Sequence, residues 1–100
     1  MIDLQQVREK LMEVNDPEIA IDIVDLGLVY SIEEPEEGIV HIRMTMTTPG
    51  CPAHDSISLL TELKAEEVSG VVKARVEVVW DPPWTPEMMN DTARLLLKFR

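Results

Sequence analysis

Residues 39–47 read Ile39-Val40-His41-Ile42-Arg43-Met44-Thr45-Met46-Thr47, and from Val40 onward apolar and polar side chains alternate. Successive side chains of an extended strand point to opposite sides, so the apolar members share one face and the polar members share the other. This alternation is typical of a sheet that has the core on one face and water on the other. The helices of the molecule are therefore expected to pack on a single face of a sheet.

The neighbouring segments predict two more strands and three helices. Residues 28–33 predict a strand that the turn at 34–38 joins to residues 39–47, so these two strands should form an antiparallel hairpin. Residues 71–80 alternate again and predict the third strand. Capping residues and prolines predict helices from Asp3 to Asn15-Asp16-Pro17, from Pro52 to about Val68, and from Thr85-Pro86-Glu87 to Lys98 and Arg100.

These elements predict an α+β fold, an α/β two-layer sandwich with the order α-β-β-α-β-α. Its sheet is expected to be three-stranded and mixed, with the helices on one face. The inner stripe of the second helix is expected to contain Ala53, Ile57, Leu60 and Leu63 or Lys64. Trp80 continues the covered face of the third strand and is expected in the core. Residues 1–100 are too few for two ordinary domains, so one domain is expected.

The chain has 100 residues, of which 9 are Lys or Arg and 19 are Asp or Glu, giving a net charge of −10. Such a charge repels nucleic-acid phosphates and anionic membranes, so neither is an expected partner. The first residues show neither the basic start nor the apolar run of a signal peptide, and no segment is apolar for the roughly 20 residues that span a membrane. A cytoplasmic location is therefore expected.

Cys51 is the single cysteine of the chain. It cannot form an intrachain disulfide, and one chain cannot supply the four thiolates of a zinc ribbon or of a conventional iron–sulfur cluster. His54 lies three residues further on, but His41 is the one other histidine in the sequence. Cys51 and His54 therefore make a weak candidate for an intrachain zinc site.

Cys51 stands at a strand-turn-helix junction that runs from Thr45 to Asp55. Gly50 permits a positive φ, and Pro52 pushes Cys51 out of the helical region and into the position that caps the helix. Free N–H groups and the helix dipole can stabilise a thiolate there, which would make Cys51 nucleophilic or metal-binding. Asp55 and the net charge act against a thiolate, and the alternative interpretation is that Cys51 is a small buried hydrophobic residue.

Two further candidates lie away from this junction. Asp25 belongs to an acidic stretch before the first strand and could orient or deprotonate a group near Cys51. The alternative, a solvated loop whose acids cap backbone donors, is favoured for any single acid. Trp84 either packs against the core or is an exposed anchor for a partner protein, and core packing is favoured.

Four motifs, taken in order, resemble the SufT/PaaD-like family of small metal–sulfur cluster assembly proteins. They are Asp16-Pro17-Glu18, Asp25-Leu26-Gly27-Leu28-Val29, Thr45-Met46-Thr47-Thr48-Pro49-Gly50-Cys51-Pro52 and Trp80-Asp81-Pro82-Pro83-Trp84, within a resemblance that runs from about Val14 to Met89. The resemblance implies an α/β fold and a role in maturing iron–sulfur proteins, as a carrier or a targeting factor for apo-proteins. It also implies that Cys51 is the reactive cysteine and cluster ligand. The pocket around it would contain Thr47, Thr48, Gly50 and Asp25.

The single cysteine limits how such a protein could hold a cluster. Any cluster is expected to be transient, and either bridged between two chains or shared with a scaffold protein, a client apo-protein or a small thiol. One alternative is a cluster-free adaptor that docks through its acidic surface and Trp84. Another is an auxiliary subunit of a multicomponent oxygenase, as in PaaD-type relatives, although the cysteine-rich extension of those relatives does not occur here. An enzyme that uses Cys51 as its nucleophile is ranked below these alternatives, because the sequence shows no complete set of catalytic residues. No enzymatic activity is therefore expected.

Overall fold

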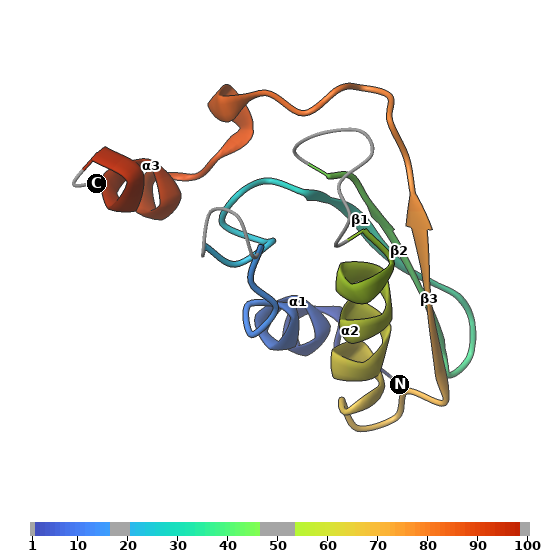
Figure 1. Ribbon diagram of the computed structural model, residues 1–100. Coiled ribbons are helices and arrows are strands. Elements are labelled where there is room, and N and C mark those ends of the chain that lie inside the picture. The colour runs from blue at the N-terminus through green and yellow to red at the C-terminus, as the bar shows by residue number, and fades with distance from the viewer. Residues whose placement is uncertain (1, 17–20, 47–53, 99–100) are drawn as a thin grey trace.

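The computed structural model of the chain describes residues 2–16, 21–46 and 54–98 (Figure 1). Its elements are α1 (Leu4–Leu11), β1 (Val29–Glu36), β2 (Ile39–Met44), α2 (His54–Glu66), β3 (Lys73–Val78), a short 3₁₀ helix η1 (Pro86–Met88) and α3 (Asp91–Lys98). This order confirms the predicted α-β-β-α-β-α series. None of the helices in the described ranges is long and apolar enough to cross a membrane.

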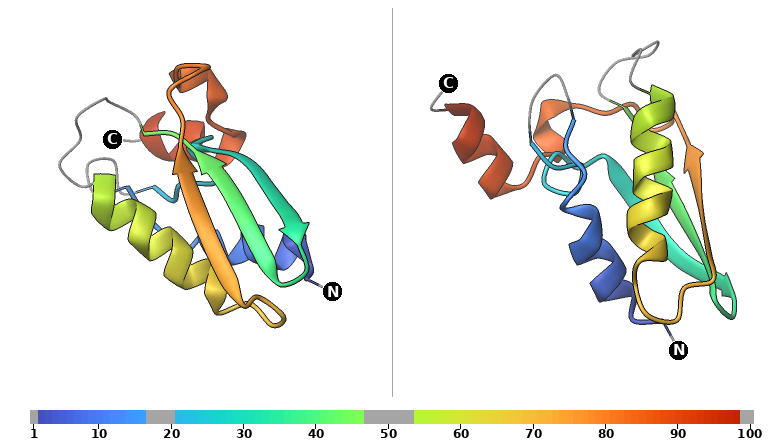
Figure 2. Two further views of the ribbon diagram at one scale, coloured as in Figure 1. Left: turned by 90° about the vertical axis from the view of Figure 1, so that its right-hand side faces the viewer. Right: turned by 60° about the horizontal axis from the view of Figure 1, so that its bottom comes forward.

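The sheet has the strand order β1-β2-β3. β1 pairs with β2 in the antiparallel sense and β2 pairs with β3 in the parallel sense, so the predicted mixed sheet is confirmed. The helices α1 and α2 lie on the same face of the sheet (Figure 1), and the left view of Figure 2 shows the opposite face uncovered. On that open face His41 Nε2 lies 3.2 Å from a carboxylate oxygen of Glu77.

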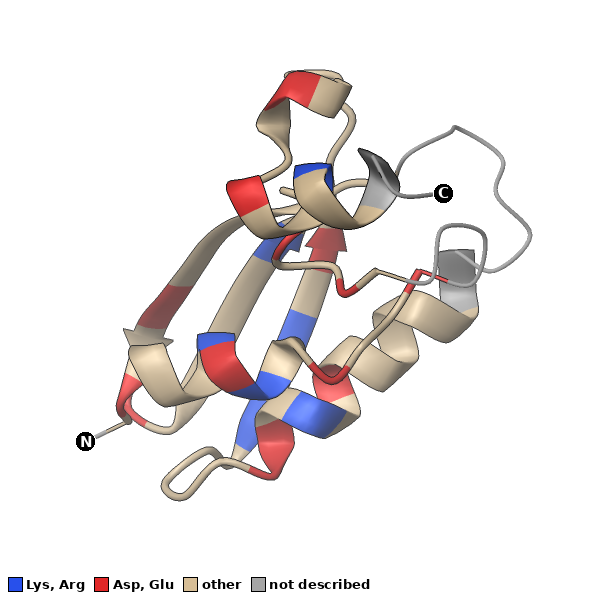
Figure 3. Cartoon of the chain, turned by 90° about the vertical axis from the view of Figure 1, so that its left-hand side faces the viewer, with Lys and Arg blue, Asp and Glu red and all other residues tan. Residues whose placement is uncertain are grey.

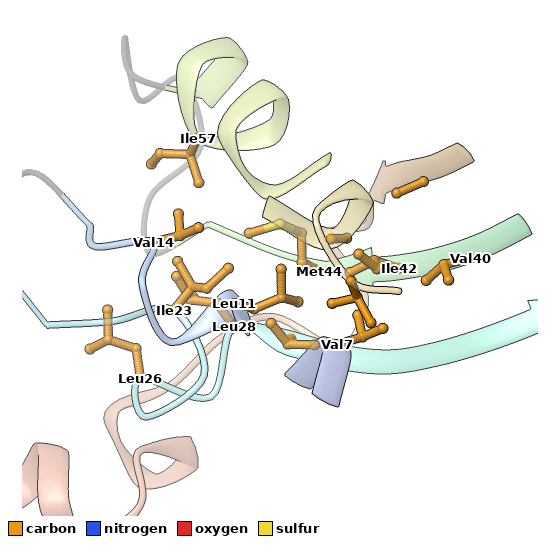
Figure 4. Packing of buried hydrophobic residues seen from close by; sticks show 14 of the residues in the cluster. Val7, Leu11, Val14, Ile23, Leu26, Leu28, Val40, Ile42, Met44 and Ile57 are labelled. Carbon is orange, nitrogen blue, oxygen red and sulfur yellow. The ribbon is translucent and has the colours of Figure 1, made fainter. Parts of the chain in front are cut away.

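The core fills the space between the sheet and the two helices (Figure 4). The predicted apolar face of residues 39–47 is confirmed for Val40, Ile42, Met44 and Met46, which are all buried. Val7 and Leu11 of α1 and Leu28 before β1 are fully buried against them. Burial of each such side chain contributes roughly 1.5–3 kcal/mol, so this cluster is the main source of stability.

The first helix begins as predicted and ends earlier than predicted. The Asp3 side chain caps it by accepting a hydrogen bond from the Gln5 backbone N–H at 2.9 Å. The helix ends at Leu11 rather than near Asn15, because residues 14–16 pair with residues 21–23 instead. Ile23 N donates to the Val14 carbonyl at 2.9 Å, which an extended chain permits and a continued helix does not.

The second helix turns a different face to the core than the one predicted. Ile57 is buried as expected, but Leu60 and Leu63 are exposed, and Ala53 lies outside the described residues. Among the residues of α2 whose burial is described, 56–66, the buried ones are Ile57, Thr61 and Ala65. Small side chains let α2 approach the sheet closely, and the Thr61 hydroxyl is satisfied inside by donating to the Ile57 carbonyl at 2.7 Å.

Helix α2 also covers the outer edge of the sheet. Val76 N donates to Glu62 Oε2 at 2.9 Å, and Ala74 N donates to Glu66 Oε2 at 3.0 Å. Glu62 and Glu66 are one helical turn apart, so they meet alternate residues of β3. Because an open edge strand invites pairing with other chains, these two bonds protect β3 from association.

The predicted third helix is interrupted. The 3₁₀ helix η1 begins at Pro86, Met89 is extended, and α3 begins only at Asp91. The helix restarts there because Asn90 Oδ1 accepts a hydrogen bond from Ala93 N at 3.0 Å and so caps α3. Trp80 was expected in the core but is 43% exposed, because β3 and its alternation end at Val78.

Candidate functional site

The acidic loop, defined as residues 21–28, precedes β1 at the end of the sheet where β2 and β3 finish (Figure 1). Asp25 in this loop is only 8% exposed. Asn90 Nδ2 donates to Asp25 Oδ1 at 2.6 Å, and Asn90 N donates to the Asp25 carbonyl at 2.9 Å. The side chain of Asp25 is therefore held in place by a residue far along the chain, and it is not the solvated side chain that was favoured from sequence.

Asp22 forms the second half of an acidic pair with Asp25. Its Oδ2 accepts a hydrogen bond from Asp25 N at 2.9 Å. Burial, together with a hydrogen bond between the two carboxyl groups, raises the pKa of Asp22 to about 6 from its ordinary 3.8. A carboxyl group with such a pKa can hold or release a proton close to neutral pH.

A single stretch of chain, the strap, holds the acidic loop. We define the strap as residues 79–90, which lead from β3 across the end of the sheet and back to the loop (Figure 1). Trp84 Nε1 donates to the Leu26 carbonyl, and the Tyr30 hydroxyl donates to the Pro82 carbonyl, each at 2.7 Å. Trp84 is half-buried and packs against the core. These contacts match the core-packing interpretation of Trp84, and its role as a partner anchor stays a prediction.

Gly27 is a point of close approach between loop and strap. It has a φ of +81°, and a Cβ atom added to it would collide with the backbone carbonyl of Met88. Beside this contact lies an open groove of about 650 Å³, whose lining includes Arg8, Tyr30 and Met88. Burial, and then the charge of Asp81, raise the pKa of the Tyr30 hydroxyl, so this group remains a hydrogen-bond donor at neutral pH.

The predicted site residues Thr47, Thr48, Gly50 and Cys51 lie outside the described residues. The chain that leads into this segment is described, because Thr45 N donates to the Leu28 carbonyl at 2.8 Å and Met46 is buried. The acidic loop is thus hydrogen-bonded to the residue two positions before Thr47. The proximity of Asp25 to Cys51 stays a prediction.

Metal ligands were expected only at Cys51. Within residues 2–16, 21–46 and 54–98, no group of three or more His, Cys, Asp or Glu side chains could hold a metal ion. This observation does not bear on Cys51.

Two residues that build this region were missed from sequence. Asn90 precedes Asp91 and an apolar run, which is a helix-start pattern, but the start was assigned to Thr85 instead. Tyr30 carries no local signal at all, because its bond to Pro82 joins residues 52 positions apart.

Comparison with known proteins gives consistent matches. Residues 4–78 match the profile of the family described as iron–sulfur cluster assembly protein. The chain is 40% identical over 84 residues to the Fe-S protein maturation auxiliary factor SufT of Staphylococcus aureus, covering 84% of this chain and 96% of that protein. It is 38% identical over 93 residues to the Fe-S protein maturation auxiliary factor YitW of Bacillus subtilis, covering 93% of this chain and 91% of that protein.

The fold is shared with solved structures as well. The crystal structure of a domain of unknown function from Bacillus anthracis superposes on this chain with a TM-score of 0.91 at 38% identity. That superposition covers 96% of this chain and 92% of the other.

Proposed function

The chain belongs to the iron–sulfur cluster assembly protein family, and from this premise we propose that it helps to mature iron–sulfur proteins. Its role would be to carry a cluster to apo-proteins or to target the assembly machinery to them. One observation carries this proposal: the chain matches proteins named as Fe-S maturation auxiliary factors over 91% and 96% of their lengths. The predicted cytoplasmic location and the single-domain organisation of residues 1–100 belong to the same proposal.

In this proposal Cys51 is the thiolate ligand for a cluster that is cargo rather than a resident cofactor. One thiolate cannot hold a conventional cluster, because such clusters take four. The remaining ligands must come from a client, a scaffold protein, a second copy of the chain or a small thiol. Thr47, Thr48 and Gly50 would shape the pocket around the cluster and donate hydrogen bonds to its sulfur atoms.

Asp25 would act by fixing the acidic loop next to the chain that leads into the Cys51 segment. The support is geometric: the Asp25 carboxyl is buried and bonded to Asn90, and the Leu28 carbonyl holds Thr45. The chain would bind and deliver its cargo rather than catalyse a reaction. The relatives' name, auxiliary factor, favours this view.

Anaerobic reconstitution with iron and sulfide tests the proposal. The wild-type protein should take up both and gain the visible absorption of a cluster, and the Cys51→Ser variant should lose both. His54→Ala is the matched control, because it changes the nearest other potential ligand in sequence and should retain the cluster. Equal iron and sulfide content in wild type and Cys51→Ser would overturn the role of Cys51.

The mass in solution before and after loading identifies the source of the missing ligands. A doubling of mass on loading points to a second copy of the chain. Loading at constant mass, dependent on added thiol, points to a small-thiol ligand. A wild-type protein that takes up no iron or sulfide under any of these conditions would overturn the carrier role and favour the cluster-free adaptor.

A further inference from the structure

The outer face of α2 carries a leucine stripe, defined as Leu59, Leu60 and Leu63. Their side chains are 57%, 40% and 50% exposed. Positions four apart lie on the same side of a helix, so Leu59 and Leu63 are adjacent and Leu60 borders them. Neighbouring exposed apolar side chains on a small acidic protein indicate a surface that another molecule covers.

The stripe is not an unfilled part of this chain's own core. The inner side of α2 is already packed through Ile57, Thr61 and Ala65, which are buried. Both views of Figure 2 show α2 beside β3 with its outer side open to solvent. The leucines therefore face away from the sheet while the helix is fully docked.

The charges around the stripe favour one kind of partner. At the end of α2 near α1, Lys10 and Lys64 each lie 3.1 Å from Glu13, and Lys10 lies 3.1 Å from Glu67, so two cations and two anions neutralise each other. Figure 3 shows blue and red segments close together where α1 and α2 end. Residues 56–61 of α2, which precede this ion-pair cluster in the chain, carry no charge.

The other border of the stripe is acidic. Glu62 and Glu66 are fixed against β3 by backbone N–H groups, and they form no ion pair within the described part of the chain. The chain as a whole carries −10. A covering surface that is apolar and bordered by Lys or Arg complements this arrangement, whereas a second copy would bring the same acids together.

The position of the stripe along α2 links it to the proposed site. α2 begins at His54, directly after the segment that contains Cys51. Leu59 is five residues further on, which is about 8 Å along a helix axis. A protein that covers the stripe therefore lies beside the junction from which the Cys51 segment departs.

We propose that the leucine stripe docks a partner protein through an apolar surface bordered by Lys and Arg. Docking there would bring the partner's own ligands to the cluster. This chain, with one cysteine, cannot supply all the ligands of the cluster. The docking role rests on the proposed function for its biological meaning, but its physical test does not require a cluster.

The test uses a defined probe, an amphipathic helical peptide about five turns long with leucines on one face and lysines on the other. Titration into the ¹⁵N-labelled protein should shift the amide signals of Leu59, Leu60 and Leu63. Two control peptides should each bind at least about tenfold more weakly. In the first, glutamates replace the lysines, so the positive charge is missing. In the second, alanines replace the leucines, so the large apolar face is missing.

Two matched double variants locate the binding. Leu59→Gln with Leu63→Gln should weaken the Leu/Lys peptide by about tenfold or more. Leu95→Gln with Leu96→Gln should not change it, although these leucines of α3 are 56% and 51% exposed. Equal binding by both variants, or shifts that map elsewhere, would overturn the proposal. The proposal would also be overturned if the wild-type protein had the mass of two chains and the variant with Leu59→Gln and Leu63→Gln had the mass of one. The stripe would then bind a second copy of the chain.

Docking and cluster binding fail separately in these experiments. Cys51→Ser should lose the cluster and retain the peptide, and Leu59→Gln with Leu63→Gln should retain the cluster and lose the peptide. Loss of peptide binding in Cys51→Ser would overturn the claim that the stripe binds the peptide independently of Cys51. A failure to load the wild type with cluster overturns the carrier role and leaves the docking surface standing.

Discussion

The acidic loop and the leucine stripe flank the Cys51 segment in the chain and differ in almost every physical respect. The loop comes before it, carries two carboxyl groups, and has its Asp25 side chain buried and hydrogen-bonded to Asn90. The stripe comes after it, is apolar, and leaves its leucines exposed although α2 is packed. The loop is built to keep one geometry, because buried polar groups are stable only with their partners in place.

The stripe has the opposite character. Its leucine side chains remain in water in the folded chain, and covering them with another apolar surface would lower the free energy. The chain that leads into the Cys51 segment is thus hydrogen-bonded to the loop through Thr45, whereas the leucines that follow the segment in the chain are exposed. Substitutions that break the contacts of Gly27 or Asp25 should therefore lower the free energy of unfolding, whereas substitutions in the stripe should leave it unchanged.

Among substitutions in the loop, the strap and the stripe, the largest effect is expected at the contact between loop and strap. Gly27→Ala places a Cβ where the Met88 carbonyl lies and forces a non-glycine residue to a φ of +81°. The combined steric and backbone cost should be about 3 kcal/mol. Thermal unfolding followed by circular dichroism should then show a fall in Tm of roughly 12–24 °C, at about 4–8 °C per kcal/mol for a domain of this size.

Gly38→Ala is the control for that measurement. Gly38 has nearly the same φ, +82°, but its new Cβ would lie closest to the side chain of Val72, which is 78% exposed, and not to a backbone carbonyl. It should cost only the backbone part, about 1 kcal/mol. Equal losses at Gly27 and Gly38 would mean that the strap contact contributes nothing.

The next effect concerns Asn90, which joins loop, strap and α3. Asn90→Ala removes the bond to the Asp25 carboxyl group and the cap on Ala93 N. Together these should cost about 2–3 kcal/mol in denaturant unfolding. Asn90→Ser retains a capping oxygen but cannot reach Asp25, so it should lose about half as much. If Ser restores wild-type stability, the bond to Asp25 is not what holds the loop.

A smaller effect follows from the acidic pair and depends on pH. The pKa of Asp22 is about 6 in the folded protein against an ordinary 3.8, so between these values the folded state binds more protons than the unfolded chain. Stability should therefore fall as the pH rises through this window, with the full loss above about pH 6. For a partly exposed group the loss should be on the order of 1 kcal/mol.

Asp22→Asn tests this sign. The amide oxygen can still accept the bond from Asp25 N but the side chain does not ionise. The variant should match the wild type near pH 4 and exceed its stability at pH 7–8, by on the order of 1 kcal/mol. Parallel stability curves over that range would contradict the acidic pair.

The parts of this molecule that the sequence predicts correctly depend on local pattern. Alternation identified the buried face of β2, and Asp3 identified the start of α1, because neighbouring residues decide both. The inner face of α2 was mispredicted because apolar residues occur on more than one of its sides. Periodicity identifies these sides but does not determine which of them packs against the sheet. In the folded chain the side with Ala65 and Thr61 is buried, and the Thr61 hydroxyl is hydrogen-bonded there, whereas the leucines are exposed.

The site divides in the same way. The family motif identified Asp25, but its partner Asn90 lies 65 positions away and no short-range pattern connects them. The strap was predicted to contain the end of the third strand and, from Thr85 onward, a continuous helix. Its break at Met89 and Asn90 arises from contacts with the loop, which exist only once the chain has folded.

The smallest expected effect completes the comparison. Leu59→Gln with Leu63→Gln should change the free energy of unfolding by less than about 0.5 kcal/mol, because both leucines are exposed and Gln has nearly the helix propensity of Leu. Ile57→Ala, on the inner side of the same helix, should cost about 2–4 kcal/mol, because it leaves a cavity in the core. A large loss for the Gln pair in urea unfolding would mean that the stripe serves the fold. A negligible loss, together with weakened peptide binding, would mean that these leucines are maintained for a partner.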